Sequence, residues 1–218
     1  MERSDLRIER KFVLGKYRET ELESILKLNG FKLLHPRRKI ESIYLDTVNY
    51  DFAKDNINGI SKRKKIRFRW YNNNTEEIFL EEKNKENFTI KKNIFDTKLN
   101  LNKNNLINEL KKYFYNTNNK MKNDNYHFIL KISYYRTYWI SENNKIRATI
   151  DVGLKTSPIN DLDKNFDLND TILEFKFEPT EEKYFREFFW KNNLNLRTKK
   201  YSKYLRSFNI LDDCGLII

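Results

Sequence analysis

The fold is decided by the stretch Lys65-Ile66-Arg67-Phe68-Arg69-Trp70, in which charged and apolar residues alternate. Successive side chains of a β-strand point to opposite faces of the sheet. Ile66, Phe68 and Trp70 therefore share one face, and Lys65, Arg67 and Arg69 share the other. The stretch predicts a strand with one apolar face and one cationic face.

Two later stretches repeat this alternation, namely Lys145-Ile146-Arg147-Ala148-Thr149-Ile150-Asp151-Val152 and Ile172-Leu173-Glu174-Phe175-Lys176-Phe177. Any one such strand fits an ordinary antiparallel sheet with a polar face toward solvent. If helices cover the apolar faces instead, the charged faces line the inside of a closed barrel. Unpaired cations inside a barrel are costly, and a bound polyanion removes that cost. The pattern therefore indicates a basic tunnel that holds a phosphate chain.

Working outward from these stretches, periodicity predicts strands separated by helices and hairpin turns. The expected fold class is α+β, a closed antiparallel β-barrel tunnel of about eight strands, with helices packed outside and a C-terminal helix at one mouth. The chain is expected to form a single domain over residues 1–218. We expect strands at 6–14, 39–46, 62–71, 77–84, 87–95, 126–141, 145–154 and 171–178, helices at 20–29, 104–115, 180–192 and 202–211, a short turn or helix at 49–56, and an acidic loop at 157–170.

The charge balance points to a polyanionic partner. The 218 residues include 43 Lys and Arg against 31 Asp and Glu, a net charge of +12. Such an excess suits nucleic acid, anionic lipid or polyphosphate, and composition does not choose among them. The chain has no Gly-rich phosphate loop, which excludes a Walker or Rossmann site. It also has no RNP-like motif, so we expect no nucleic acid partner.

The remaining composition predicts a soluble cytoplasmic protein. Cys214 is the one cysteine and cannot form an internal disulfide, which favours a reducing compartment. No apolar run follows the charged N-terminus, and no stretch approaches the roughly 20 apolar residues of a spanning helix. We therefore expect no signal peptide and no transmembrane segment, and the sequence leaves the oligomeric state unknown.

Eight short motifs in order give the chain a family resemblance. It resembles the VTC domain of polyphosphate polymerases, within the triphosphate tunnel metalloenzyme superfamily, from Ile8 to Phe208. The motifs are Ile8-Glu9-Arg10-Lys11-Phe12, Tyr44-Leu45-Asp46-Thr47, the stretch 61–71, Leu80-Glu81-Glu82-Lys83, Tyr135-Arg136-Thr137, Arg147-Ala148-Thr149-Ile150-Asp151, Leu173-Glu174-Phe175-Lys176 and Lys200-Tyr201-Ser202-Lys203-Tyr204.

This resemblance implies a function and a set of site residues. It implies transfer of the γ-phosphoryl group of ATP to inorganic polyphosphate, with Mn²⁺ or Mg²⁺ as cofactor. Glu174 would hold the metal, assisted by Glu9 or Asp151, and Lys91 or Lys92 would be a further phosphate ligand. The residues implied to be catalytic by binding phosphates are Lys11, Arg67, Arg69, Lys83, Arg136 and Arg147, with Lys200, Ser202 and Lys203 capping the tunnel near the transferred phosphate.

Two of the acidic residues also have simpler interpretations. The alternative for Glu174 is a salt bridge to an interior arginine. Asp151 is expected to be structural and to pair with Arg147 or Lys145. His35, His127 and Cys214 have no spacing that suits a metal site.

The first strand distinguishes branches of the superfamily. Its hydrolases often begin with Glu-x-Glu-x-Lys, whereas this chain has Arg7-Ile8-Glu9-Arg10-Lys11, with Arg7 in place of the first acid. That replacement is similar to the polymerase branch. Three functions stay open: a polyphosphate polymerase, a tunnel triphosphatase acting on tripolyphosphate or a nucleoside triphosphate, and a non-catalytic polyphosphate-binding module.

Overall fold

The computed structural model describes residues 7–15, 19–87, 89–97, 105–117, 126–191 and 197–217. Residues 6, 104 and 192, at the ends of three predicted elements, lie outside these ranges. Within them the chain forms a mostly antiparallel sheet and five α-helices, which confirms the α+β class. The elements are β1 (Ile8–Gly15), α1 (Glu19–Leu28), β2 (Phe31–Thr47), α2 (Asp51–Ile57), β3 (Arg63–Tyr71), β4 (Asn74–Glu86), β5 (Thr89–Asp96), α3 (Leu106–Thr117), β6 (Tyr126–Ser141), β7 (Arg147–Pro158), β8 (Phe166–Asp167), β9 (Asp170–Phe177), α4 (Glu182–Lys191) and α5 (Lys203–Asp213).

The sheet has nine strands in the order β1-β9-β7-β6-β2-β3-β4-β5, with β8 paired to β7. The sequence missed β8, which is two residues long and lies within the predicted acidic loop. The order ends at β1 and at β5, and no hydrogen-bonded pairing in the described ranges joins these two strands. Closure of the barrel therefore stays a prediction.

The chain divides into two compact units. Unit 1 comprises residues 1–39, 134–155 and 167–202, and unit 2 comprises residues 40–133, 156–166 and 203–218. Strands β2, β6, β7 and β8 contribute residues to both units. The single domain over residues 1–218 stays a prediction.

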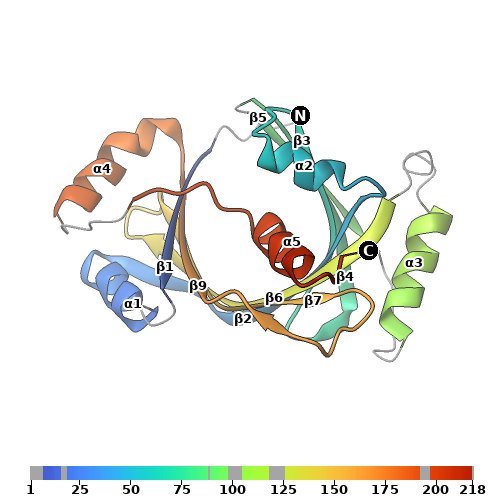
Figure 1. The fold of residues 1–218 in the computed structure, drawn as a ribbon. Coiled ribbons are helices and arrows are strands. Elements are labelled where there is room, and N and C mark those ends of the chain that lie inside the picture. The colour runs from blue at the N-terminus through green and yellow to red at the C-terminus, as the bar shows by residue number, and fades with distance from the viewer. Residues whose placement is uncertain are drawn as a thin grey trace. The chain divides into compact units, whose positions relative to one another are not determined.

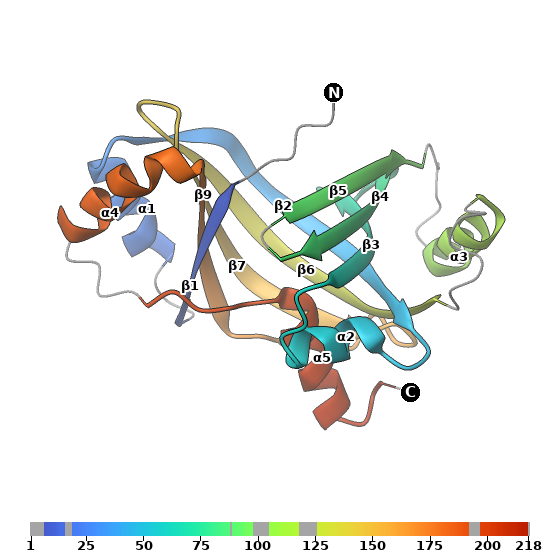
Figure 2. The ribbon, with the colours of Figure 1, turned by 90° about the horizontal axis from the view of Figure 1, so that it is seen from above.

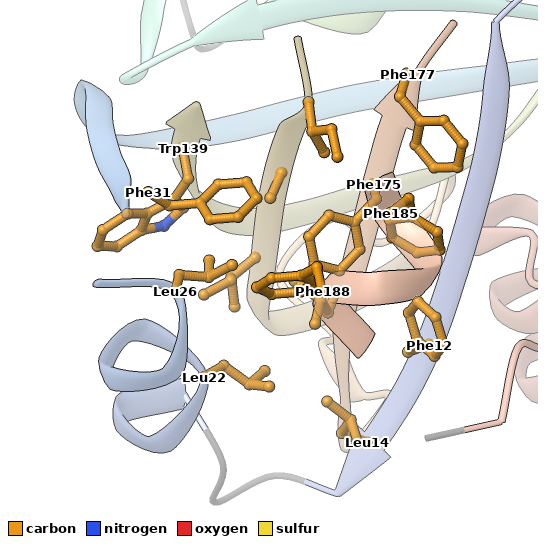
Figure 3. Close-up of a cluster of buried hydrophobic side chains, with 14 of the residues drawn as sticks. Phe12, Leu14, Leu22, Leu26, Phe31, Trp139, Phe175, Phe177, Phe185 and Phe188 are labelled. Atoms are coloured by element: carbon orange, nitrogen blue, oxygen red, sulfur yellow. The ribbon is translucent and has the colours of Figure 1, made fainter. Parts of the chain in front are cut away.

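In unit 1, helices α1 and α4 pack on the apolar face of the sheet. Strands β1 and β9 lie side by side in Figure 1. Phe175 of β9 contacts the rings of Phe12, Phe185 and Phe188, with ring centroids 5.2 to 6.2 Å apart. Leu22 and Leu26, one helical turn apart on α1, reach the same cluster (Figure 3). The expectation that helices cover an apolar face is confirmed for this unit.

In unit 2, strands β3, β4 and β5 form an antiparallel meander, seen side by side in Figure 2. Ile66, Phe68 and Trp70 point to one face of β3 and are buried. Leu110 and Phe114 of α3 belong to the same apolar cluster. The alternation of charged and apolar residues from Lys65 to Trp70 therefore predicted correctly which face of β3 is buried.

Strand β2 is longer than predicted. The sequence predicted residues 39–46, whereas the strand runs from Phe31 to Thr47. Its first half has mostly exposed residues and lacks the alternation that marks a half-buried strand. At its other end the buried carboxylate of Asp46 accepts hydrogen bonds from the backbone N–H groups of Phe52 and Ala53, and so fixes the start of α2.

No helix in the described part of the chain is long and apolar enough to cross a bilayer.

Candidate phosphate-binding site

Unit 1 has a charged face opposite its apolar core. Register places Glu9 of β1 beside Lys176 of β9, and Lys176 beside Arg147 of β7. Two residues along each strand, on the same face, Lys11 lies beside Glu174, and Glu174 lies beside Thr149. We call these residues, together with Arg136 and Asp151, the unit 1 charged face. It gathers five of the predicted site residues, namely Glu9, Lys11, Arg136, Arg147 and Glu174.

Two carboxylates and two ammonium groups interlock on this face. The Nζ atom of Lys176 lies 3.0 Å from Glu174 and 3.3 Å from Glu9. The Nζ atom of Lys11 lies 3.6 Å from Glu174 and 4.0 Å from Glu9. Burial alone would lower the pKa of Lys176, but Glu174 and Glu9 outweigh it and raise that pKa. Lys176 therefore stays cationic, and Glu174 is held between two lysines.

Asp151 pairs with Arg136, which corrects the predicted partners Arg147 and Lys145. Its fully buried carboxylate accepts hydrogen bonds from both Nε and Nη2 of Arg136, the second at 2.7 Å. Arg147 lies four residues earlier on the same strand, about 13 Å away along the chain. Lys145 instead pairs with Glu181 at 2.9 Å. Arg136 is therefore a fixed guanidinium whose charge is balanced by one buried acid.

The segment before α5 runs beside β1. The backbone N–H of Lys199 donates to the carbonyl of Lys11 at 2.9 Å, and Phe12 forms a β-bridge with Thr198. The Nζ atom of Lys11 lies 3.5 Å from the carbonyl oxygen of Tyr201. These contacts bring exposed Lys200 and half-buried Ser202 to the β1 edge of the unit 1 charged face.

Unit 2 has its own charged face, on which Glu81 is the central residue. The Glu81 carboxylate lies 2.6 Å from Arg67, 2.7 Å from Lys92 and 3.8 Å from Arg69. Burial alone would raise the pKa of Glu81, but Arg67, Arg69 and Lys92 outweigh it and lower that pKa to about 2. One anion thus gathers three cations, including the predicted pair Arg67 and Arg69.

Register also identifies the further lysine that the sequence left open. Lys92 lies beside Lys83 across β4 and β5, on the face that carries Glu81. Lys91 lies beside Asn84 and therefore points to the other face. Lys83 and Lys92 belong to the unit 2 charged face, with Arg67, Arg69, Glu81 and Tyr44.

The C-terminal helix α5 packs against this face of unit 2. Tyr204 stacks on Tyr44, with ring centroids 5.2 Å apart, and its hydroxyl donates to the Asp46 carboxylate. Tyr44 in turn accepts a hydrogen bond from Arg67 at 2.8 Å. Lys203, the first residue of α5, is half-buried. Figure 2 shows α5 beside α2, which belongs to the same unit.

Sequence reasoning missed several members of these faces. Glu81 was part of a family motif but was assigned no role, because the cations around it lie on the neighbouring strands β3 and β5. Sequence reasoning also missed Arg38, which lies before the predicted start of β2. The guanidinium of Arg38 lies 5.8 Å from the centre of the Tyr138 ring, and that of Arg136 lies 5.9 Å from the same ring.

The carboxylates of unit 1 fit a divalent cation whose other ligands are phosphate oxygens and water. No group of three or more His, Cys, Asp or Glu residues gathers in the part of the chain that the structure describes. Glu174 and Glu9 lie together, bridged by the same two lysines. Mg²⁺ and Mn²⁺ prefer carboxylate oxygens, and Mg²⁺ is often held by one or two carboxylates plus substrate phosphates and water. Two carboxylates are therefore a sufficient protein contribution.

Glu81 is expected to make stability depend on acid pH. Its pKa is lowered from 4.5 to about 2 on folding, so its contribution is complete above 4.5 and is lost as pH falls toward 2. We expect Glu81→Gln to lower the free energy of unfolding by about 3 kcal/mol at pH 6, and by progressively less toward pH 3. Urea denaturation at several pH values measures this. Exposed Glu77→Gln is the control, and a Glu81→Gln deficit that stays constant with pH would contradict the assignment.

The fold and the charged faces together define a class of protein. Clusters of Arg and Lys on the strands of an antiparallel sheet, interleaved with a few carboxylates, are suited to phosphate groups. Comparison with known families specifies the class further. The VTC domain family matches residues 6–211, and the chain belongs to this family. No curated protein matches the chain.

Solved structures show the same fold. A candidate adenylyl cyclase from Hippeastrum, HpAC1, which is described as having a dominant triphosphatase activity, superposes with a TM-score of 0.59 at 12% identity, over 97% of this chain and 98% of its own. A candidate adenylate cyclase from Bacillus halodurans superposes with a TM-score of 0.57 at 15% identity, over 90% of this chain and 94% of its own. The chain therefore has the triphosphate tunnel fold.

Proposed function

We propose that this protein is a polyphosphate polymerase, which transfers the γ-phosphoryl group of ATP to the end of a polyphosphate chain. The observation that carries the proposal is membership of the VTC domain family over residues 6–211, together with Arg7, which directly precedes β1, in place of the first acid of the Glu-x-Glu-x-Lys motif. We further propose that the fold closes as a barrel around the phosphate chain, in keeping with the triphosphate tunnel fold.

The reaction needs alignment and charge neutralisation more than it needs a base. A terminal oxygen of the acceptor phosphate attacks the γ-phosphorus, the bond from that phosphorus to the β–γ bridging oxygen breaks, and ADP leaves with the electron pair. No proton has to move, because the acceptor oxygen is already ionised. The proposed protein contribution is positioning of phosphates by Arg and Lys.

The state of the carboxylates supports transfer to phosphate over hydrolysis. An attacking water needs a group that accepts its proton, and a good general base has a pKa near the working pH. Glu81 has a pKa of about 2 and is bound to Arg67 and Lys92. Asp151 is bound to Arg136, and Glu174 to Lys11 and Lys176. Carboxylates held in this way favour an acceptor that needs no deprotonation.

The proposed roles follow the two charged faces. Each phosphate-binding residue would donate hydrogen bonds or present charge to phosphate oxygens. Glu174 and Glu9 would hold Mn²⁺ or Mg²⁺, which when bound supplies further charge neutralisation at the phosphates. The proposed phosphate ligands are Lys11, Arg136, Arg147 and Lys200 in unit 1, assisted by Ser202, and Arg67, Arg69, Lys83, Lys92 and Lys203 in unit 2.

A tunnel triphosphatase is the second candidate. The observation that favours it is the fold shared with HpAC1, which is described as having a dominant triphosphatase activity. Tripolyphosphate or a nucleoside triphosphate would then be the substrate, and water would be the acceptor. A non-catalytic polyphosphate-binding module is the third candidate, since the same cations would bind the chain without turning it over.

Analysis of the reaction products distinguishes the three candidate functions. We expect purified protein incubated with ATP and Mn²⁺ to form ADP and polyphosphate in step, measured by chromatography and by gel staining of the polymer. Phosphate released without polymer would instead identify a hydrolase. Retained binding of polyphosphate with no turnover of ATP or tripolyphosphate would identify a binding module.

A further inference from the structure

One buried hydroxyl on the unit 1 charged face lacks a partner. The Oγ1 atom of Thr149 is buried and makes no hydrogen bond with any described residue. Two other side-chain atoms share this property in the described ranges, in Asn56 and Ser207, but they belong to helices α2 and α5 of unit 2. A buried polar group without a partner costs free energy, so such a group in a folded protein calls for an explanation.

The position of Thr149 among charged residues suggests why its hydroxyl has no partner. Arg147 precedes it and Asp151 follows it on the same face of β7, each two residues away. Across the sheet, Thr149 lies beside Glu174, which is bound to Lys11 and Lys176. The unpartnered hydroxyl therefore lies on the unit 1 charged face, which contains five of the predicted phosphate or metal ligands.

The charges around Thr149 select the kind of ligand. Asp151 balances Arg136, while Glu174 and Glu9 balance Lys11 and Lys176. Arg147 is exposed and forms no ion pair with the residues that the structure describes. A water molecule would satisfy the hydroxyl but would add no charge complementary to the nearby guanidinium of Arg147. A cation cannot accept the hydrogen bond that the hydroxyl can donate. A phosphate oxyanion satisfies both groups, because its several oxygens accept from a hydroxyl and a guanidinium together.

We propose that the Thr149 hydroxyl donates a hydrogen bond to a substrate phosphate, next to Arg147, and is a binding residue of this site. The inference rests on the proposed role of the unit 1 charged face in binding phosphate, but it does not require turnover. It therefore applies equally to a polymerase, a hydrolase and a binding module.

Two substitutions of Thr149 test the proposal by binding alone. Valine has the shape of threonine without the hydroxyl, and serine keeps the hydroxyl. Titration calorimetry with tripolyphosphate in metal-free buffer is expected to give a Kd about tenfold higher for Thr149→Val than for the unmodified chain. Thr149→Ser should stay within about twofold. Because the hydroxyl has no hydrogen-bond partner in the described part of the chain, the melting temperature of Thr149→Val should not fall by more than about 2 °C.

Thr137 provides the matched control. It is a buried threonine of unit 1 whose hydroxyl accepts a hydrogen bond from Trp139 at 3.0 Å. Thr137→Val should lower the melting temperature and leave the Kd for tripolyphosphate unchanged. Thr149→Val with an unchanged Kd would overturn the proposal, as would an unmodified chain that does not bind tripolyphosphate. Tripolyphosphate binding that is weakened by Thr149→Val, in a protein that forms no polymer, would refute the polymerase and leave this inference standing.

Discussion

Replacing Glu174 with glutamine is expected to lower the rate of polymer formation by about 100-fold at saturating ATP. The substitution keeps the size of the side chain and removes its negative charge. It would weaken the proposed binding of Mn²⁺ and release Lys11 and Lys176 from their shared partner. Because the effect acts through the cation, the Mn²⁺ concentration that gives half the maximal rate should also rise. ADP release and polymer length, followed over a range of Mn²⁺ concentrations, measure both effects.

Glu178 offers a control for this experiment. It follows β9 directly, is exposed, and lies four residues from Glu174. Glu178→Gln makes the same change of charge in the same part of the chain and should leave the rate unchanged. A Glu174→Gln variant that turns over ATP as fast as the unmodified chain would refute the assignment of Glu174. If the protein is a triphosphatase, the same 100-fold loss is expected in phosphate release.

Replacing Asp151 with asparagine is expected to be the most destabilising change in unit 1. Asp151 is fully buried, and its carboxylate accepts both hydrogen bonds from Arg136. Removing one partner of a buried ion pair leaves the other charge uncompensated, at a cost of about 3–5 kcal/mol. For a chain of this size we expect the melting temperature to fall by about 10 °C. Thermal unfolding followed by circular dichroism measures this shift.

A double-mutant cycle shows whether the loss of stability comes from the ion pair between Asp151 and Arg136. Arg136→Met removes the charge that Asp151→Asn leaves unpaired, so the double variant should be less destabilised than the sum of the two single variants. Exposed Asp163→Asn should leave the melting temperature unchanged. Additive effects of Asp151→Asn and Arg136→Met would show that the two side chains do not stabilise one another.

Alternation along single strands was enough to predict which charged side chains share a face. Burial of Ile66, Phe68 and Trp70 fixes the opposite direction for Arg67 and Arg69, because the period of two is a local property of an extended backbone. The same reasoning put Glu174 and Lys176 on one face. The family resemblance, carried by eight ordered motifs, is confirmed by the match over residues 6–211.

The partners of these side chains were beyond the reach of the sequence. Asp151 was expected to pair with Arg147 or Lys145 because they are near in the chain, but it pairs with Arg136 on a neighbouring strand. Lys91 and Lys92 were equally suitable until the β4–β5 register placed Lys92 beside Lys83. A register shift of one residue would exchange the faces, and register depends on the turns and on packing against other elements.

The sequence by itself determined which side chains of each strand are charged and share a face, together with the family and the α+β class. Only the tertiary structure decided which charges meet, namely Glu81 with three cations and Glu174 between two lysines. It also decided that the Thr149 hydroxyl has no hydrogen-bond partner among the residues that the structure describes. The physical reason is that these two properties depend on different parts of the chain. The direction of a side chain follows from the adjacent backbone, whereas the neighbour it contacts is contributed by strands and helices far away in the chain.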